Sequence, residues 1–492
     1  MPEARNDNAG SPATQVEGSC NCKGNSHVVV VIDGNKTTAA APTNRRDPEV
    51  CPLISKVHGR VRSIDPGAYD PMVVSLGPYH TGRDDLLQMQ REKPMCMREI
   101  CSLTGRTELY FLQQVISAHL RQQALAYYLH GIHDLKQAAA AGRNERDNII
   151  LLNFRFNRML LHDAAFLLVT MKALDDVAAA AHGERRTHGR WTDVAIVHDL
   201  LLLENQIPFA VVEKLYYEVA AVGEDDDGHC KPFSDVMRDF VRSIIEKHAN
   251  RGCSIHQNGR AVHHLLHQCH MLLEPTESPA TGDTTGSRDD DDDDDASVDR
   301  LKRRWHRAVQ YHVAGVGLTK RIFDGGVRHH RLLDVEYRGG ALEIPVLHVY
   351  DNTCSMLRNL MAMEQATAGV GNYVTAYCVF LSRLMCTSED VALLTKKGIL
   401  VHHLGSDEVV AGLFADLCKN VVFDDDDVGC NYLREACVAA DERYQSRVRN
   451  WITWLKHKHF GNPWLATAAI AAVVVTICTV VQAVCAVLPK KQ

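Results

Sequence analysis

The sequence feature that most constrains the fold is the run DLLLLENQIPF at residues 199–209. Four consecutive leucines belong in a hydrophobic core, but they lead directly into the polar residues 204–206, Glu-Asn-Gln. Buried polar groups destabilise a fold unless they are hydrogen-bonded. These three side chains therefore either satisfy backbone groups at a helix end or form a polar network inside the core. Pro208 disfavours the α conformation of Ile207, so we expect the helix to end there.

Helical periodicity dominates most of the remaining sequence. Apolar side chains recur at spacings of three and four residues, which places them on one face of a helix. Ser and Thr residues that precede such segments are typical N-caps, as Thr387, Ser388 and Ser406 are here. Helices are expected over residues 107–130, 153–174, 389–397 and 407–419.

Two segments instead show the pattern of β structure. Residues 71–80 form a short apolar run that ends in a Gly-Pro turn, which predicts a strand. Apolar and polar residues alternate on either side of Gly339-Gly340 within 331–351, which predicts a β-hairpin. The predicted fold class is therefore mainly α: a single large helical domain with a few short β elements and one C-terminal transmembrane helix.

Composition divides the chain into three regions. Residues 1–46 are polar and predict a mostly disordered leader without a secretory signal peptide. Residues 47–460 form a globular domain, interrupted by an acidic insertion at 275–299 that contains seven consecutive aspartates, 289–295. Such a run repels itself and lacks the glycine turn of a calcium site, so a solvated, disordered loop is expected.

The third region, residues 464–488, contains no charged residue. As a helix it would be about 37 Å long, which exceeds the hydrocarbon core of a bilayer. A transmembrane helix is expected, with a buried core helix as the alternative. Four Lys and Arg residues lie within the 20 residues before it and two lysines lie after it, which favours a cytoplasmic N-terminal domain. The prediction is a single-pass protein of the plasma membrane or an endomembrane.

Charge and motifs argue against several function classes. The net charge of −7 owes much to the acidic run and gives no reason to expect a nucleic-acid partner. The 16 cysteines form no regular Cys-x-x-Cys pairs, so neither a zinc ribbon nor a disulfide scaffold is indicated. The sequence contains no Walker A loop, dinucleotide-binding glycine motif, G-x-S-x-G elbow or kinase signature. We therefore predict no catalytic residues, no cofactor and no enzymatic activity.

The sharpest candidate cluster consists of histidines. On a helix, His263, His267 and His270 would share one face at i, i+4 and i+7, a spacing that could hold a metal. No H-E-x-x-H motif accompanies them, so ordinary packing and surface roles are favoured. Asp163 lies in an apolar helical segment and could be a general base or part of a structural network. A metal-assisted hydrolase that uses His263, His267 and Asp163 is the alternative to a non-enzymatic role.

Two other acidic residues are expected to be structural. Glu204 is followed by Asn205-Gln206, and Glu364 is followed by Gln365. Both acidic residues close apolar segments, where a carboxylate can satisfy helix ends. The two carboxylates could therefore cap helices or brace each other across a core.

Several short motifs also occur in a characteristic order. They are Cys51-Pro-Leu-Ile-Ser-Lys-Val57, Ala68-Tyr69-Asp70-Pro71, Val74-Ser-Leu-Gly-Pro-Tyr-His80, Met159-Leu-Leu-His-Asp163 with Phe166, the 199–209 run, Ile344-Pro345, Arg358-Asn359-Leu360 with Glu364-Gln365, and Asp390-Val391 with Gly398-Ile399. The combination resembles the plant family of domain of unknown function 247, also called uncharacterised protein family 0481. The resemblance covers about residues 27–488. The chain departs from the family pattern at His58 and within residues 162–166, which puts in doubt any role tied to those positions.

The resemblance implies a plant membrane-associated protein of no established enzymatic activity. Some grass members are implicated as pollen-side determinants of self-incompatibility, so a role in pollen–stigma recognition is a hypothesis for this chain. Together with the uncharged C-terminal segment, the resemblance favours a tail-anchored recognition or scaffold module that binds an unidentified protein. A purely structural membrane protein is a third possibility.

Overall fold

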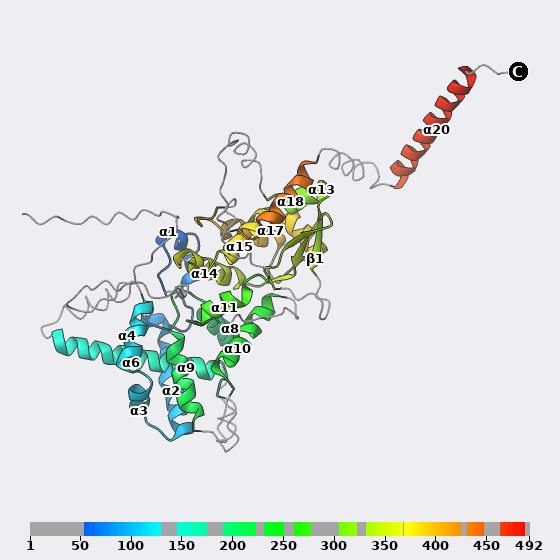
Figure 1. Ribbon diagram of the computed structural model, residues 1–492. Helices are drawn as coiled ribbons and strands as arrows, with labels where there is room; N and C mark the ends of the chain where they lie inside the picture. The colour runs from blue at the N-terminus through cyan, green and yellow to red at the C-terminus, as the bar shows by residue number, and fades with distance from the viewer. Residues whose placement is uncertain are drawn as a thin grey trace, which may run out of the picture. The chain divides into compact units, whose positions relative to one another are not determined.

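All residues that the structure describes belong to one compact unit within Val50–Gln492. The computed structural model (Figure 1) describes residues 54–128, 145–174, 190–222, 231–249, 260–276, 305–321, 331–367, 369–424, 431–446 and 463–487. The predicted leader, most of the predicted acidic insertion and its seven aspartates lie outside these residues.

Helices form most of the described chain, so the predicted mainly α class is confirmed. The first half contains α1 (Gly59–Arg62), α2 (Leu87–Thr104), α3 (Glu108–Gln114), α4 (Ala118–Tyr127), α6 (Glu145–Thr170), α8 (Arg190–Leu200), α9 (Phe209–Ala220), α10 (Phe233–His248) and α11 (Leu265–Leu273), with short 3-10 turns at Pro66–Tyr69 and Asp84–Leu86. The second half contains α13 (Ala308–Val313), α14 (Thr353–Ala366), α15 (Tyr373–Leu384), α16 (Ser388–Lys396), α17 (Asp407–Leu417), α18 (Arg434–Gln445) and α20 (Pro463–Val487).

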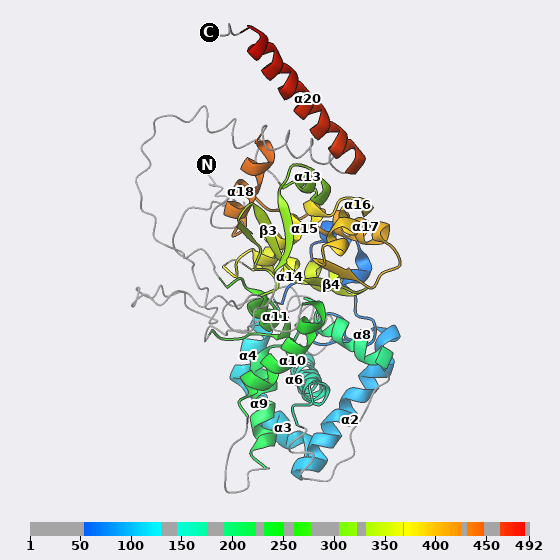
Figure 2. The same cartoon turned by 90° about the vertical axis from the view of Figure 1, so that its right-hand side faces the viewer.

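Helix α6 is the central helix of the first half and contains most of the helix predicted over residues 153–174. It packs against α2 and α9 (Figures 1 and 2). Leu160 and Phe166 in its second half are fully buried. The single helix predicted over 107–130 is wrong, because two helices, α3 and α4, occupy this stretch. Ser117 explains the break: its hydroxyl accepts the N–H of Leu120 and caps a new helix.

Two small sheets lie in the second half. Strands β2 (Glu336–Arg338) and β3 (Ala341–Pro345) form the predicted antiparallel hairpin, and Gly339 and Gly340 adopt φ values of 56° and 86° at its turn. Strand β1 (Gly317–Arg321) pairs in parallel with β3, and β4 (Leu347–Val349) pairs in parallel with β5 (Leu400–His402). Alternation within one segment does not predict parallel pairs, because their partners are distant in sequence.

The predicted caps at the start of α16 and α17 are confirmed. Thr387 and Asp390 form a capping box at α16, and Gly398, with a φ of 69°, follows the helix. Ser406 accepts the N–H of Val409 at the start of α17. Local sequence therefore defines these two helices well.

The helix that carries the leucine run ends earlier than predicted, at Leu200 rather than near Ile207. Side-chain amides bind the carbonyl groups that further helical turns would have used. Asn205 Nδ2 donates to the carbonyl of Asp199 at 2.9 Å, and Gln206 Nε2 donates to that of Leu200 at 2.7 Å. These bonds satisfy the end of α8 and let the chain turn inside the core.

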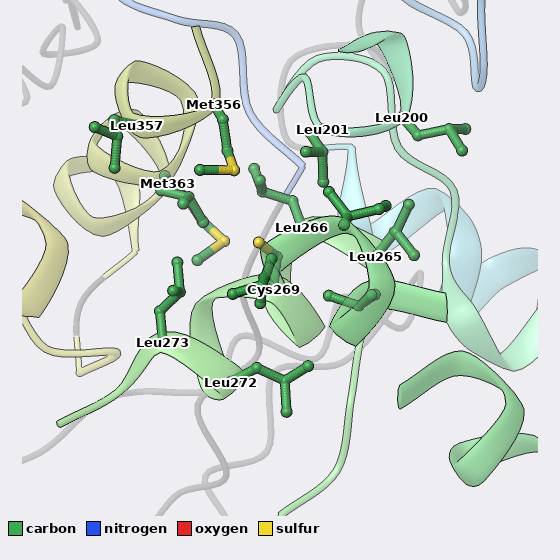
Figure 3. Close-up of a cluster of buried hydrophobic side chains, with 14 of the residues drawn as sticks. Leu200, Leu201, Leu265, Leu266, Cys269, Leu272, Leu273, Met356, Leu357 and Met363 are labelled. Atoms are coloured by element: carbon green, nitrogen blue, oxygen red, sulfur yellow. The ribbon is translucent and has the colours of Figure 1, made fainter. Parts of the chain in front are cut away.

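The leucine run nevertheless packs in the core, as expected. Figure 3 shows Leu200 and Leu201 approaching α11, while Met356 and Met363 of α14 meet the other side of α11 near Cys269. All five of these side chains are buried. Helix α11 is therefore covered on one side by the end of α8 and on the other by α14.

The C-terminal segment is helical over Pro463–Val487 as α20. Within the described part of the chain, however, no helix is both long and apolar enough to cross a membrane. The membrane span predicted over 464–488 therefore stays a prediction.

Candidate functional site

The strand predicted over residues 71–80 is wrong: the chain bends at 72–73 and 77–80, and no strand is formed there. Side chains bind this backbone instead. The carboxylate of Asp199 accepts the N–H groups of Met72, Val73 and Val74 at 2.8, 2.7 and 2.8 Å. A single carboxylate thus takes the place of the carbonyl groups that a neighbouring strand would supply.

Asn205 continues this pairing from the fully buried interior. Its Oδ1 accepts the N–H of Leu76 at 2.6 Å, and its Nδ2 donates to the carbonyl of Val74 at 3.0 Å. The side chain therefore offers an acceptor and a donor to the same segment. The polar network that the sequence suggested for residues 204–206 is confirmed, and it is hydrogen-bonded as burial requires.

Glu204 joins the same stretch to the start of the described chain. Its Oε1 accepts the N–H of Val57 at 2.6 Å and lies 2.7 Å from a guanidinium nitrogen of Arg62. Its Oε2 lies 3.7 Å from Nε2 of His80, whose pKa is lowered by burial. Glu204 is thus a buried, paired carboxylate with a structural role.

Asp163 lies on α6 and is almost completely buried. It accepts the N–H of Gly77 at 2.8 Å and forms an ion pair of 2.5 Å with Lys93 of α2. Burial raises the pKa of this carboxyl, and the Lys93 charge opposes that shift. Because its bonds all point inward to the fold, this arrangement supports the structural interpretation of Asp163 over the general base.

Of the three candidate metal-binding histidines, His263 and His267 contact each other, and His270 has a different partner. His263 precedes α11, and its Nδ1 lies 2.8 Å from the hydroxyl of Tyr127. His267 stacks on the His263 ring, and its Nδ1 accepts the N–H of His263 at 3.3 Å. His270 points its Nε2 to Glu364 at 2.7 Å. The helix-face spacing predicted for the three is wrong, because α11 begins at Leu265.

No group of three or more His, Cys, Asp or Glu side chains with metal-binding placement occurs among the described residues. His267 is held in an acceptor role, and burial lowers its pKa to about 2. The neighbouring His264 caps α11 by accepting the N–H of His267. The structure does not bring Asp163 to this cluster, since Asp163 is paired with Lys93.

Glu364 has one of the two structural roles expected for it and Glu204: it caps a helix. Its carboxylate accepts the N–H groups of Val374 and Thr375 at 2.9 and 2.8 Å, at the start of α15. The same carboxylate binds His270 on α11. Glu364 therefore ties α14, α15 and α11 together, whereas Gln365 is exposed. Helix capping is confirmed for Glu364, but its partners differ from those of Glu204.

A hydrogen-bonded chain of Ser355, His198 and Asp199 was not predicted from the sequence. His198 Nε2 lies 3.0 Å from Ser355 Oγ, and its Nδ1 lies 3.0 Å from Asp199 Oδ1. This order matches the bonding of a serine-hydrolase triad. However, the Ser355 hydroxyl donates to the carbonyl of Ala68 at 2.7 Å, and all three side chains are buried. The only sequence signal was the adjacent His198-Asp199 pair, since Ser355 is distant in sequence.

The first half of α6 presents an exposed apolar face that the sequence analysis did not identify. Ile150, Leu151 and Phe154 are 67%, 47% and 49% exposed. In Figure 1 this end of the helix extends beyond α3 and α4. Exposed apolar side chains that adjoin on a helix are typical of interaction surfaces. We call Ile150, Leu151 and Phe154 the α6 face.

Comparison with known proteins agrees with the motif-based resemblance. The UPF0481 protein At3g47200 of Arabidopsis thaliana is 25% identical over 442 residues, which cover 87% of this chain and 84% of that protein. The putative UPF0481 protein At3g02645 of the same plant is 21% identical over 520 residues, covering 90% and 92%. No solved structure matches the chain significantly. The sequence profile of DUF247, described as a plant protein of unknown function, matches residues 54–478, so the chain belongs to the DUF247 family.

Proposed function

We propose that the protein is a non-enzymatic recognition or scaffold module that binds another polypeptide through the α6 face. The observation that carries the proposal is the exposure of Ile150, Leu151 and Phe154 at the end of a helix whose second half is buried. Burying such side chains against a partner removes apolar surface from water, and aromatic residues dominate many interfaces.

The roles of four buried acidic side chains support the same proposal. Asp163, Asp199 and Glu204 bind backbone N–H groups inside the fold. Glu364 caps α15 in the same way. These interactions position helices and the segment 71–80, which is what a rigid presenting domain requires.

Membrane attachment through α20 is the second part of the proposal. The helix lies in the segment without charged residues, and Val473, Val475 and Ile477 are 59%, 64% and 58% exposed. The hydroxyls of Thr476 and Thr479 donate to the carbonyls of Ala472 and Val475, both at 2.8 Å. Hydroxyls that bond back to their own helix are compatible with an apolar environment.

The membrane proposal is tested by alkaline extraction of cell membranes that contain the full chain. Retention of the parent in the pellet, and release of a variant that ends before residue 463, would support attachment by α20. Protease protection then tests the proposed orientation, because a cytoplasmic N-terminal domain is digested on intact vesicles. Release of the parent into the supernatant would contradict the proposal.

The binding proposal is tested by comparing two leucine substitutions with similar exposure. Leu151 on the α6 face is 47% exposed, and Leu87 at the start of α2 is 44% exposed. Leu151→Ser should weaken the co-purification of specifically bound polypeptides, whereas Leu87→Ser should not. Equal behaviour of both variants would contradict a role for the α6 face.

A role in pollen–stigma self-incompatibility is the most specific form of this proposal, and it derives from the family resemblance. It predicts that the coding locus cosegregates with self-rejection and that a knockout accepts its own pollen. Self-rejection that persists in the knockout would rule this role out and leave the general binding proposal intact.

A further inference from the structure

Two exposed arginines continue the α6 face along the helix. Arg155 and Arg158 follow Leu151 at i+4 and i+7, so they lie on the same side of α6 as the exposed apolar residues. The opposite side of the helix is turned inward, where Phe156 and Leu160 are buried. The exposed side of α6 therefore carries an apolar stretch and then a positively charged one.

The two arginines differ in the partners that they already have. Arg158 Nε donates to Glu108 of α3 at 2.7 Å, yet the Arg158 side chain is 51% exposed. Arg155 is also exposed and forms no ion pair with any residue that the structure describes. One carboxylate beside two guanidinium groups leaves a net positive charge here. A guanidinium has five N–H donors, so Arg158 can bind a second carboxylate without releasing Glu108.

We propose that the α6 face binds an acidic amphipathic helix of its partner polypeptide. Apolar side chains of that helix would cover Ile150, Leu151 and Phe154, and its carboxylates would bind Arg155 and Arg158. An amphipathic helix presents its apolar anchors in a line, which matches a stripe that follows the axis of another helix. The inference rests on the proposed function for its surface and adds the chemistry of the partner.

Charge complementarity is the reason to expect carboxylates on the partner. The planar fork of a guanidinium matches the two oxygens of a carboxylate, and such charged hydrogen bonds are stronger than neutral ones. A basic segment on the same apolar residues would bring like charges against Arg155, which disfavours that partner. The apolar residues thus supply buried area, and the arginines select the sign of the partner's charge.

Two other occupants fit this surface less well. Segments that bind anionic lipid surfaces carry clusters of about 4–8 Lys and Arg residues, whereas this surface has two arginines and Glu108 offsets one of them. The chain's own aspartate run, 289–295, contains no apolar residue and so does not complement Ile150, Leu151 and Phe154. An acidic segment that also carries apolar residues satisfies both parts of the surface.

The test places a photoreactive phenylalanine analogue at Phe154 of the full-length chain in membranes of its native tissue, and mass spectrometry identifies the crosslinked segment. This segment should carry apolar residues at helical spacing and an Asp or Glu within about one turn of them. Arg155→Glu should lower the yield of the product at least about fivefold, because like charges then meet. Arg155→Lys keeps the charge and should retain most of the yield.

Arg91→Glu in α2 is the matched control. Arg91 is exposed and, like Arg155, forms no ion pair with a described residue, so this variant should crosslink like the parent. Thermal melting checks that every variant is folded.

Three outcomes would overturn the acidic partner: a crosslinked segment without carboxylates, a product within residues 289–295 of the same chain, or equal yields for the parent and Arg155→Glu. The proposed function survives the first and the third outcomes, because a polypeptide is still bound at the α6 face. A lipid adduct at position 154, or no product at all, would contradict both the inference and the proposed function.

Discussion

The carboxylate of Asp199 accepts the backbone N–H of Val73 at 2.7 Å, and the same side chain also binds the N–H groups of Met72 and Val74. Asp199 is fully buried at the end of α8, while Val73 lies in a non-helical segment more than a hundred residues earlier. This relationship shows what the DLLLLENQIPF run does: its polar side chains act as the hydrogen-bonding edge for a segment without a strand partner.

Replacing Asp199 by alanine should strongly destabilise the fold. Three N–H groups would lose their acceptor; that of Val74 is buried, whereas those of Met72 and Val73 are only partly buried. A buried donor left unpaired costs about 1–3 kcal/mol, so we expect a loss of about that size in the free energy of unfolding. Tryptophan fluorescence during thermal melting measures it, and Asp193→Ala, at an exposed position of the same helix, is the control. A parent-like melting temperature for Asp199→Ala would contradict the role of Asp199.

The sequence predicted that a hydrogen-bonded polar network exists here, but not which residues it binds. A leucine run that enters Glu-Asn-Gln implies satisfied polar groups in a core, and this was confirmed for Asn205. The location of α16 and α17 was also predictable, because their caps are local. The partners of Asp199 and the parallel pairing of β4 with β5 could not be predicted from the sequence, because they depend on contacts between distant segments. For the same reason, the sequence did not indicate that Ser355 lies beside His198.

Gly77 should tolerate no side chain, although many glycines do. Its φ is 67°, and an added Cβ would lie 2.7 Å from the carbonyl oxygen of Gln206. Gly82 also has a positive φ, 88°, but nothing lies within 4 Å of its added Cβ. Both alanine variants therefore carry backbone strain of about 1 kcal/mol, and only Gly77→Ala adds a steric clash. A melting temperature for Gly77→Ala at or above that of Gly82→Ala would show that this close approach is unimportant.

Glu364 should prove structural rather than catalytic. Glu364→Ala removes the acceptor for the N–H groups of Val374 and Thr375 and the partner of His270, so we expect a loss of about 2–4 kcal/mol. Gln365→Ala is the neighbouring control, because Gln365 is exposed, and it should lie within about 0.5 kcal/mol of the parent. Chemical denaturation measures both variants, and equal stability would refute the proposed cap.

Acidification should destabilise the protein through His267. Burial lowers the pKa of His267 from 6.5 to about 2, so below pH 6.5 the unfolded chain binds a proton that the folded chain excludes. Above pH 6.5 the protonation of His267 therefore takes little from the free energy of unfolding. As the pH falls, the free energy of unfolding decreases, by about 2 kcal/mol at pH 5. His267→Gln keeps an acceptor without titrating, so its stability should fall less than that of the parent between pH 7.5 and 5. Equal pH dependence of parent and variant would contradict the excluded proton.

The Ser355–His198–Asp199 chain should not behave as a hydrolase triad. The Ser355 hydroxyl donates to the carbonyl of Ala68, and its side chain is buried, so a fluorophosphonate probe should not label the native full-length protein. Ser355→Ala should instead lower the free energy of unfolding by about 1 kcal/mol. Labelling of the parent that is lost in Ser355→Ala would establish a reactive serine and reopen the enzymatic alternative.

Recognition through the α6 face is tested most directly by site-specific photocrosslinking of the full-length protein in its native tissue. A photoreactive phenylalanine analogue is placed at Phe154, which is 49% exposed, or at Val194 on α8, which is 59% exposed. Our account predicts a discrete crosslinked polypeptide at position 154 and no such product at position 194. Products at neither position, or the same products at both, would contradict it.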